Sequence, residues 1–132
     1  MDPPGGAGEA LSRVARGVTA QARGLSAEAT SVAALLADGF TVLGQRLRTP
    51  SGEVDLVAVR GDLLVFVEVK ARPTLSEAAF ALSPRQITRL LAAAAWLLAE
   101  HPDWTRADIR FDVMLVDGQG RVRRVADAFR QA

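Results

Sequence analysis

Four charged residues lie at the outer ends of two neighbouring apolar runs of the chain, and their types could support metal-dependent hydrolysis. They are Glu53, Asp55, Glu68 and Lys70. Two carboxylates held close together repel each other, and each tends to take up a proton unless a cation lies between them. A hard divalent cation such as Mg²⁺ or Mn²⁺ prefers carboxylate oxygens and makes a bound water more acidic. A neighbouring amine could orient or deprotonate that water, or stabilise charge that develops on a phosphate.

The elements that must position these residues form a predicted β-hairpin. Its two β-branched and aliphatic runs are 54–59 and 63–69, and they flank Arg60-Gly61-Asp62. Such runs around a glycine are typical of two strands joined by a tight turn. With Gly61 at the first central position of a type II′ turn, Asp55 lies opposite Glu68 and Glu53 opposite Lys70. Because side chains alternate between the faces of a strand, all four would project from one face, and the apolar residues on both faces indicate central strands.

Lys70 is the only lysine among the 16 Lys and Arg residues of the chain. Arginine stays protonated in proteins, whereas lysine shifts its pKa readily when buried and acts as a compact point charge. The only one of these 16 residues that is not an arginine therefore lies beside the acid pair. We interpret this position as support for a chemical role of Lys70. The competing structural interpretation is a solvated hairpin end, in which Glu53 and Lys70 form an ordinary cross-strand ion pair.

Asp55 followed by Glu68-Val69-Lys70 resembles the Asp…Glu-x-Lys signature of the PD-(D/E)XK nuclease superfamily, which includes many restriction endonucleases and archaeal Holliday-junction resolvases. The chain resembles more closely the YraN-like family of small bacterial proteins. The segments that carry this likeness are Gly52-Glu53-Val54-Asp55-Leu56, Val65-Phe66-Val67-Glu68-Val69-Lys70-x-Arg72, Gly24-x-x-Ala27-Glu28-x-x-Ser31, Arg110-Phe111-Asp112-Val113 and Ala128-Phe129. Gln45 and Arg85 depart from the Asn and Lys expected in that family.

The resemblance implies an α/β fold with a restriction-endonuclease-like core, a mixed central sheet of about five strands flanked by helices. The implied catalytic residues are Asp55, Glu68, Lys70 and Glu53. Asp55 and Glu68 would bind Mg²⁺ or Mn²⁺, with the backbone carbonyl of Val69 as a further ligand. The expected function is a metal-dependent nuclease that hydrolyses phosphodiester bonds in nucleic acid. DNA is favoured over RNA, and branched DNA is one candidate substrate, but the sequence does not choose between DNA and RNA or between branched and linear substrates. The alternative is a catalytically silent nuclease-fold module that binds nucleic acid or a protein partner.

Glu28 is a second-tier candidate for the metal site. Ser26 is a predicted helix N-cap and Gly39 a predicted terminator. Glu28 would then lie in the first turn, where a carboxylate complements the helix dipole. The spacing alone favours this structural role. The resemblance implies instead that a glutamate on the first helix joins the metal site, as in resolvase-like relatives.

The formal net charge is only +1, so any attraction to nucleic acid must come from local clusters of arginine. The candidate nucleic-acid contacts are Arg46, Arg48, Arg72, Arg85 and Arg89. Arginines taken singly are more often residues that solvate a surface, but the resemblance places the helix of Arg85 and Arg89 beside the DNA cleft. If the substrate is a symmetric DNA junction, its two-fold symmetry would match that of a homodimer, so a homodimer is a candidate assembly.

Capping residues and hydrophobic periodicity predict the remaining elements. These are a helix at 26–38, a strand at 40–48, a loop at 73–82, a helix that starts at Ser83-Pro84 and ends at His101-Pro102, and strands at 109–116 and 121–125. Residues 1–23 are predicted to form a flexible N-terminal arm and residues 24–132 a single nuclease-like domain.

Composition excludes several classes of protein. The chain has 132 residues and is 49% apolar, which suits one domain with one core. It has no cysteine, which excludes disulfides, thiolate catalysis and a Cys-ligated zinc site and is consistent with the cytoplasm. We expect no membrane partner, because no segment resembles a signal peptide or has the ~20 apolar residues that span a bilayer.

Overall fold

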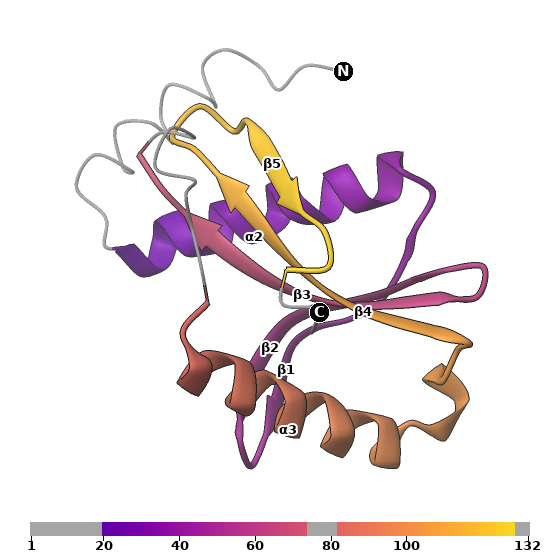
Figure 1. Cartoon of the computed structure of the whole chain (residues 1–132). Coiled ribbons are helices and arrows are strands. Elements are labelled where there is room, and N and C mark those ends of the chain that lie inside the picture. The colour runs from indigo at the N-terminus through magenta and orange to yellow at the C-terminus, as the bar shows by residue number, and fades with distance from the viewer. Residues whose placement is uncertain (1–19, 74–81, 129–132) are drawn as a thin grey trace.

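The computed structural model describes residues 20–73 and 82–128, which form a five-stranded sheet with one long helix against each face (Figure 1). In chain order the elements are α2 (Ala20–Ala37), β1 (Thr41–Thr49), β2 (Gly52–Arg60), β3 (Leu63–Ala71), α3 (Pro84–Glu100), the 3₁₀ turn η2 (Pro102–Trp104), β4 (Asp108–Val116) and β5 (Val122–Val125). This architecture confirms the predicted α/β class and is consistent with a restriction-endonuclease-like core. Most of the predicted arm and of the predicted loop at 73–82 lie outside the described residues, as does Phe129.

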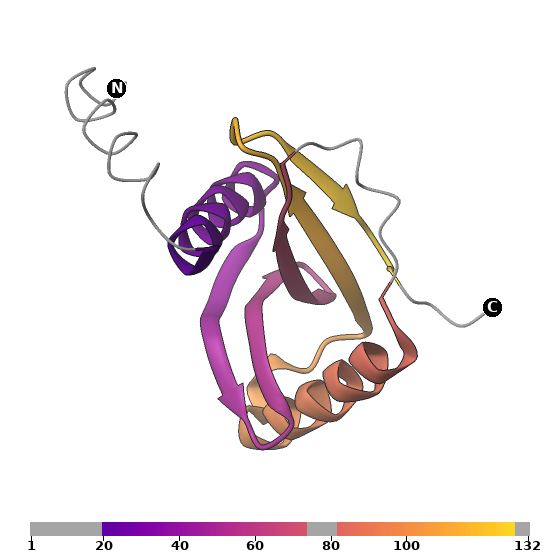
Figure 2. The same ribbon diagram turned by 90° about the vertical axis from the view of Figure 1, so that its left-hand side faces the viewer.

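The strands lie in the order in which they occur along the chain. β3 and β4 are parallel and the other neighbours antiparallel, so the sheet is mixed. Parallel neighbours need a long crossover, and α3 lies in the connection between β3 and β4. Figure 2 shows α2 and α3 on opposite sides of the curved sheet. Leu35 of α2 packs in one apolar cluster with Leu56 and Val65, and Leu97 of α3 packs in a second with Val57 and Phe66.

The predicted hairpin register is confirmed. β2 and β3 pair from Arg60↔Leu63 to Leu56↔Val67, and Gly61 has φ +59°, as the first central residue of a type II′ turn requires. The ladder between these strands ends at Leu56↔Val67. Asp55 and Glu68 therefore lie immediately beyond the last ladder pair, where their side chains rather than their backbones connect the two strands.

Helix α2 begins earlier than its capping pattern predicts. It starts at Ala20, so Ser26 lies inside the helix and its predicted role as N-cap is wrong. Alanine and glutamine at 20–22 are good helix formers that continue the helix past this position. The helix crosses the expected boundary between arm and domain, and it has no acidic residue in its first turn. Glu28 consequently cannot complement the helix dipole in the way its spacing suggests.

Helix α3 begins where the sequence predicts. The Ser83 side chain accepts a hydrogen bond from the backbone N–H of Gln86, whose side chain accepts one from the Ser83 N–H. Pro84 occupies the first helical position, and this reciprocal cap defines the start of the helix.

Within the part of the chain that the structure describes, no helix combines the length and the apolar character that crossing a membrane requires.

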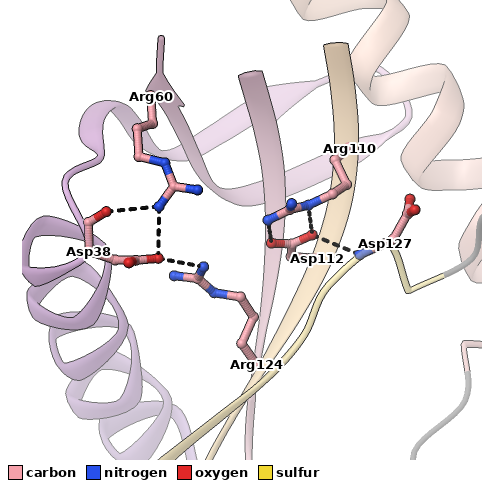
Figure 3. A network of polar contacts seen from close by, with 6 residues as sticks. All are labelled: Asp38, Arg60, Arg110, Asp112, Arg124 and Asp127. Atoms are coloured by element: carbon pink, nitrogen blue, oxygen red, sulfur yellow. Dashed lines mark hydrogen bonds and ion pairs between the residues drawn. The ribbon is translucent and has the colours of Figure 1, made fainter. Parts of the chain in front are cut away.

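A polar clamp joins the end of α2 to the sheet (Figure 3). Asp38 accepts hydrogen bonds from Arg60 of β2 through its backbone carbonyl and from Arg124 of β5 through its carboxylate. Both guanidinium groups also lie over the ring of Phe40, at 4.4 and 5.3 Å from its centroid. These arginines therefore serve the fold, since each combines an ion pair with a cation–π contact.

Candidate functional site

Asp55 connects the two hairpin strands through its side chain. Its Oδ2 accepts a hydrogen bond of 2.8 Å from the backbone N–H of Val69 on β3. This bond fixes the carboxylate across the end of the ladder and beside Glu68. Burial raises the pKa of Asp55 above its ordinary value, although the Val69 N–H and the charge of Lys70 act in the opposite direction.

Glu68 is the most deeply buried acid of this group, with only 6% of the residue exposed. Its Oε2 accepts a hydrogen bond of 2.8 Å from Arg89 of α3, whereas its buried Oε1 has no hydrogen-bond partner among the described residues. Burial, reinforced by the charge of Asp55, raises the pKa of Glu68 to about 7. A buried carboxylate oxygen without a donor is costly, and a ligand in need of an oxygen donor would remove that cost.

Lys70 is partly buried at the same end of the hairpin. It lowers the pKa of both Asp55 and Glu68 through its charge, but forms no ion pair within 4 Å in residues 20–73 and 82–128. Glu53 pairs instead with Arg48, at 3.7 Å, so the ordinary cross-strand pair of Glu53 with Lys70 does not form there. The ammonium is near the acids without being paired to either one.

Glu28 joins the acids from a different element. Its side chain is only 13% exposed and lies 4.0 Å from Nε of Arg46. Burial raises the pKa of Glu28, and the charge of Asp55 adds to the rise. A helix residue 27 positions before Asp55 in the chain is thus part of the same electrostatic group.

Arg46 has an unusual backbone next to this group. Its φ is +52°, a left-handed conformation that costs free energy in a non-glycine residue. The β1–β2 ladder pairs Gln45 with Leu56 and Leu47 with Val54, so Arg46 lies across from Asp55 between these pairs. The side chain of Arg46 lies near the acids at this position, with Nε 4.0 Å from Glu28.

The other predicted nucleic-acid contacts lie at different distances from the acids. Arg48 has a side chain that is 91% exposed, and Arg85 is exposed in the first turn of α3. Arg72 donates a hydrogen bond to the carbonyl of Ala71 at the end of β3. Arg89 differs from all of these, because it contacts Glu68 directly.

Two features of the site were missed by the sequence reasoning. Arg89 was predicted only as a phosphate contact, but it is the ion-pair partner of Glu68. Gly52 makes room for it, because a Cβ at that position would lie 2.8 Å from Nη1 of Arg89. The helical spacing of Arg89 indicates only which face of α3 it occupies, and no local signal in the sequence links it to Glu68.

The donor set fits a divalent cation that keeps part of its water shell. The described residues contain no group of three or more His, Cys, Asp or Glu arranged to hold a metal ion, so the carboxylates available are mainly the Asp55–Glu68 pair. Mg²⁺ is commonly held by one or two carboxylates together with waters and substrate phosphates. The raised pKa of both acids and the unpartnered Oε1 of Glu68 are what such a cation would relieve.

Comparison with known proteins identifies close relatives over most of the chain. Residues 27–116 match the model of the family described as "Uncharacterised protein family UPF0102". A UPF0102 protein from Granulibacter bethesdensis is 55% identical over 118 residues, which cover 89% of this chain and 75% of the relative. One from Bradyrhizobium diazoefficiens is 45% identical over 96% of this chain and 95% of the relative. One from Acidiphilium cryptum is 50% identical over 92% and 94%, respectively.

Proposed function

This chain belongs to the UPF0102 family, and we propose that it is a metal-dependent nuclease that hydrolyses phosphodiester bonds in nucleic acid. Family membership confirms the YraN-like resemblance of the strand motifs. The observation that carries the proposal is the Asp55–Glu68 pair, two partly desolvated acids of raised pKa at one point of the sheet. A fold gains no stability from such an arrangement, so a ligand that needs two carboxylates accounts for it best.

Asp55 and Glu68 would hold the cation, Mg²⁺ or Mn²⁺, and the backbone carbonyl of Val69 would add a third oxygen. Val69 is suited to this role because its N–H already bonds to Asp55, which keeps its peptide group beside the acid pair. Glu28 is the second-tier ligand. When bound, the cation would supply an acidified water and positive charge for the departing oxygen.

Lys70 and Glu53 would act beside the acids. Lys70 has no ion-pair partner among the described residues, so its side chain is available to the reaction. As the ammonium it would orient the attacking water or stabilise the charged phosphate, and as the neutral amine it would take up the proton of that water. Glu53 raises the pKa of Asp55 and Glu28, which tunes the acid group. Arg46, Arg48, Arg72 and Arg85 would hold phosphates on either side of the scissile bond.

The choice of DNA over RNA, and of branched DNA in particular, rests on the resemblance to resolvases. So does the homodimer that a symmetric junction would suit. The cytoplasm is the compartment in which we place this activity, since a chain without cysteine needs no oxidising environment.

The central test combines metal binding with cleavage. We expect calorimetric titration to show Mn²⁺ binding to the wild type and its loss in Glu68→Gln, because the variant removes one of two charged ligands. We also expect wild-type protein with Mn²⁺ to cleave at least one of branched, flapped and single-stranded DNA. Intact DNA in every assay, together with equal Mn²⁺ binding by wild type and Glu68→Gln, would refute the nuclease proposal.

Replacing Lys70 by Ala is expected to lower the cleavage rate about 100-fold, the lower end of the range for a positioned acid–base group. Mn²⁺ affinity should not fall, because Lys70 contacts neither acid directly and its positive charge lies near both of them. Lys70→Arg is the informative companion variant, since arginine keeps the charge but does not give up its proton. Recovery of activity in Lys70→Arg indicates charge stabilisation, and failure to recover indicates proton transfer. Single-turnover rates at saturating DNA measure both.

A catalytically silent module is the alternative function, and one observation favours it. Arg89 already provides Glu68 with a cationic partner at 2.8 Å, which partly satisfies the acid without metal. Under this alternative the protein binds nucleic acid or a protein partner without cleavage. DNA binding that is equal in EDTA and Mn²⁺, and unchanged in Lys70→Ala, would select the silent module.

A further inference from the structure

Arg89 reaches the acid site from α3, the helix in the connection between β3 and β4. Its Nη2 donates a hydrogen bond of 2.8 Å to Oε2 of Glu68, and its Nη1 donates one of 2.9 Å to the backbone carbonyl of Glu53. The side chain remains 31% exposed. One guanidinium group thus connects α3 to both hairpin strands that carry the acids.

Gly52 provides the space that this contact needs. Its φ of +123° suits glycine far better than any other residue. A Cβ there would lie 2.8 Å from Nη1 and 3.1 Å from Cδ of Arg89. The β1–β2 turn is therefore shaped around the arginine, which argues that the contact with Glu68 belongs to a built site and is not an incidental surface pairing.

The backbone that carries Arg89 is held in place, whereas its side chain is partly exposed to solvent. The capping box of Ser83 and Gln86 holds the first turn of α3, and Leu90 and Ala93 are buried on its inner face. A partly exposed arginine on a fixed helix can change rotamer without moving the helix. Departure from Glu68 consequently requires only the loss of two hydrogen bonds by one side chain.

A divalent cation bound at the acid pair would repel the guanidinium of Arg89 from its position at Glu68. A divalent cation on Glu68 would lie within a few ångströms of the guanidinium, and like charges at such distances repel strongly in a partly buried site. Arg89 bonds Oε2 and leaves Oε1 without a partner among the described residues, so a cation on Oε1 would share one carboxylate with the guanidinium and would be opposed by its charge. The released guanidinium would be partly exposed to solvent beside the acids, and its planar fork matches a phosphate in two-point contact.

We propose that Arg89 is an internal competitor of the divalent cation at Glu68, and that it transfers from this carboxylate to a substrate phosphate when the cation binds. This inference rests on the proposed function, because it requires that Glu68 be a metal ligand. Arg89 is on this account a positioning residue that links the two binding events. The coupling makes Arg89 oppose metal binding in the absence of nucleic acid and favour binding of nucleic acid in the presence of metal.

The test measures Mn²⁺ affinity without nucleic acid, by calorimetry, for wild type, Arg89→Met and Arg89→Gln. Loss of the competitor should tighten Mn²⁺ binding roughly tenfold in both variants, within the usual range for coupled sites. Arg106→Met is the matched control, because Arg106 donates hydrogen bonds to the carbonyls of Asp103 and Thr105 in its own loop and should leave Mn²⁺ affinity unchanged. Circular dichroism and thermal melting confirm that each variant is folded.

A second measurement follows the other half of the coupling. Anisotropy of a fluorescent duplex oligonucleotide, with Ca²⁺ in place of the catalytic metal, should show roughly tenfold weaker binding for both Arg89 variants than for wild type. Opposite changes in metal and DNA affinity in one variant would support the proposal, since a purely structural role would weaken both.

The outcomes separate the two proposals. If wild type binds Mn²⁺, Glu68→Gln does not, and neither Arg89 variant binds more tightly than wild type, the competitor role is refuted while the nuclease site stands. If wild type and Glu68→Gln bind Mn²⁺ equally weakly or not at all, the metal site itself is refuted and the competitor role falls with it. Tighter Mn²⁺ binding with unchanged DNA binding would refute the transfer to phosphate.

Discussion

Metal-free wild-type protein is expected to lose stability as the pH rises from about 5 to about 8, and Glu68→Gln is expected to remove most of this loss. The pKa of Glu68 in the folded protein is raised from 4.5 to about 7, so the folded state binds a proton that the unfolded chain releases at lower pH. The associated stability is fully present below the unfolded pKa and is lost as the pH rises through the folded pKa. At 1.36 kcal/mol per pKa unit, the loss is up to about 3 kcal/mol.

Asp55 and Glu28 act in the same direction, because burial raises the pKa of each. Urea unfolding in EDTA across this pH range measures the effect. At about pH 8, Glu68→Gln should be up to about 3 kcal/mol more stable than wild type, since glutamine resembles the protonated acid. Glu100→Gln is the control, because Glu100 is exposed at the end of α3. A wild-type stability that stays level or rises over this range relative to Glu68→Gln would contradict the prediction.

Replacing Asp112 by Asn is expected to lower the free energy of unfolding by about 3 kcal/mol, the lower end of the cost of breaking a buried ion pair. The Asp112 side chain is fully buried and pairs with Arg110. Its two oxygens accept hydrogen bonds from Nε and Nη2 of Arg110 at 2.8 and 2.9 Å, and Oδ1 also accepts one from the backbone N–H of Asp127 (Figure 3). Asparagine keeps the shape but leaves a guanidinium that is only 23% exposed without its counter-charge.

Urea unfolding at neutral pH measures this change, with Asp62→Asn as control. Asp62 is exposed in the hairpin turn, and its substitution should change stability by less than about 0.5 kcal/mol. Metal affinity gives a second readout and should be unchanged in Asp112→Asn. Asp112 contacts Arg110 and Asp127 and is not part of the acid group of Asp55 and Glu68. Unchanged stability in Asp112→Asn would show that this pair is not needed for the fold.

Local rules were enough to predict the elements whose information is contained in neighbouring residues. Gly61 between two β-branched runs determined the hairpin turn and its register, and Ser83-Pro84 determined the start of α3. The capping rule failed at Ser26, because good helix formers on its N-terminal side continue α2 through it. A local pattern decides an element only where no stronger neighbour competes.

The amino-acid sequence by itself determined that two acids and one lysine come together at the end of a hairpin, because a tight turn leaves the two strands one register. Only the tertiary structure decided what surrounds them. Glu28 reaches the acids because α2 packs on the sheet, and Arg89 reaches Glu68, 21 positions away, because α3 crosses back over the other face. Such contacts depend on how helices dock through apolar side chains, and that docking carries no signal at the polar residues themselves.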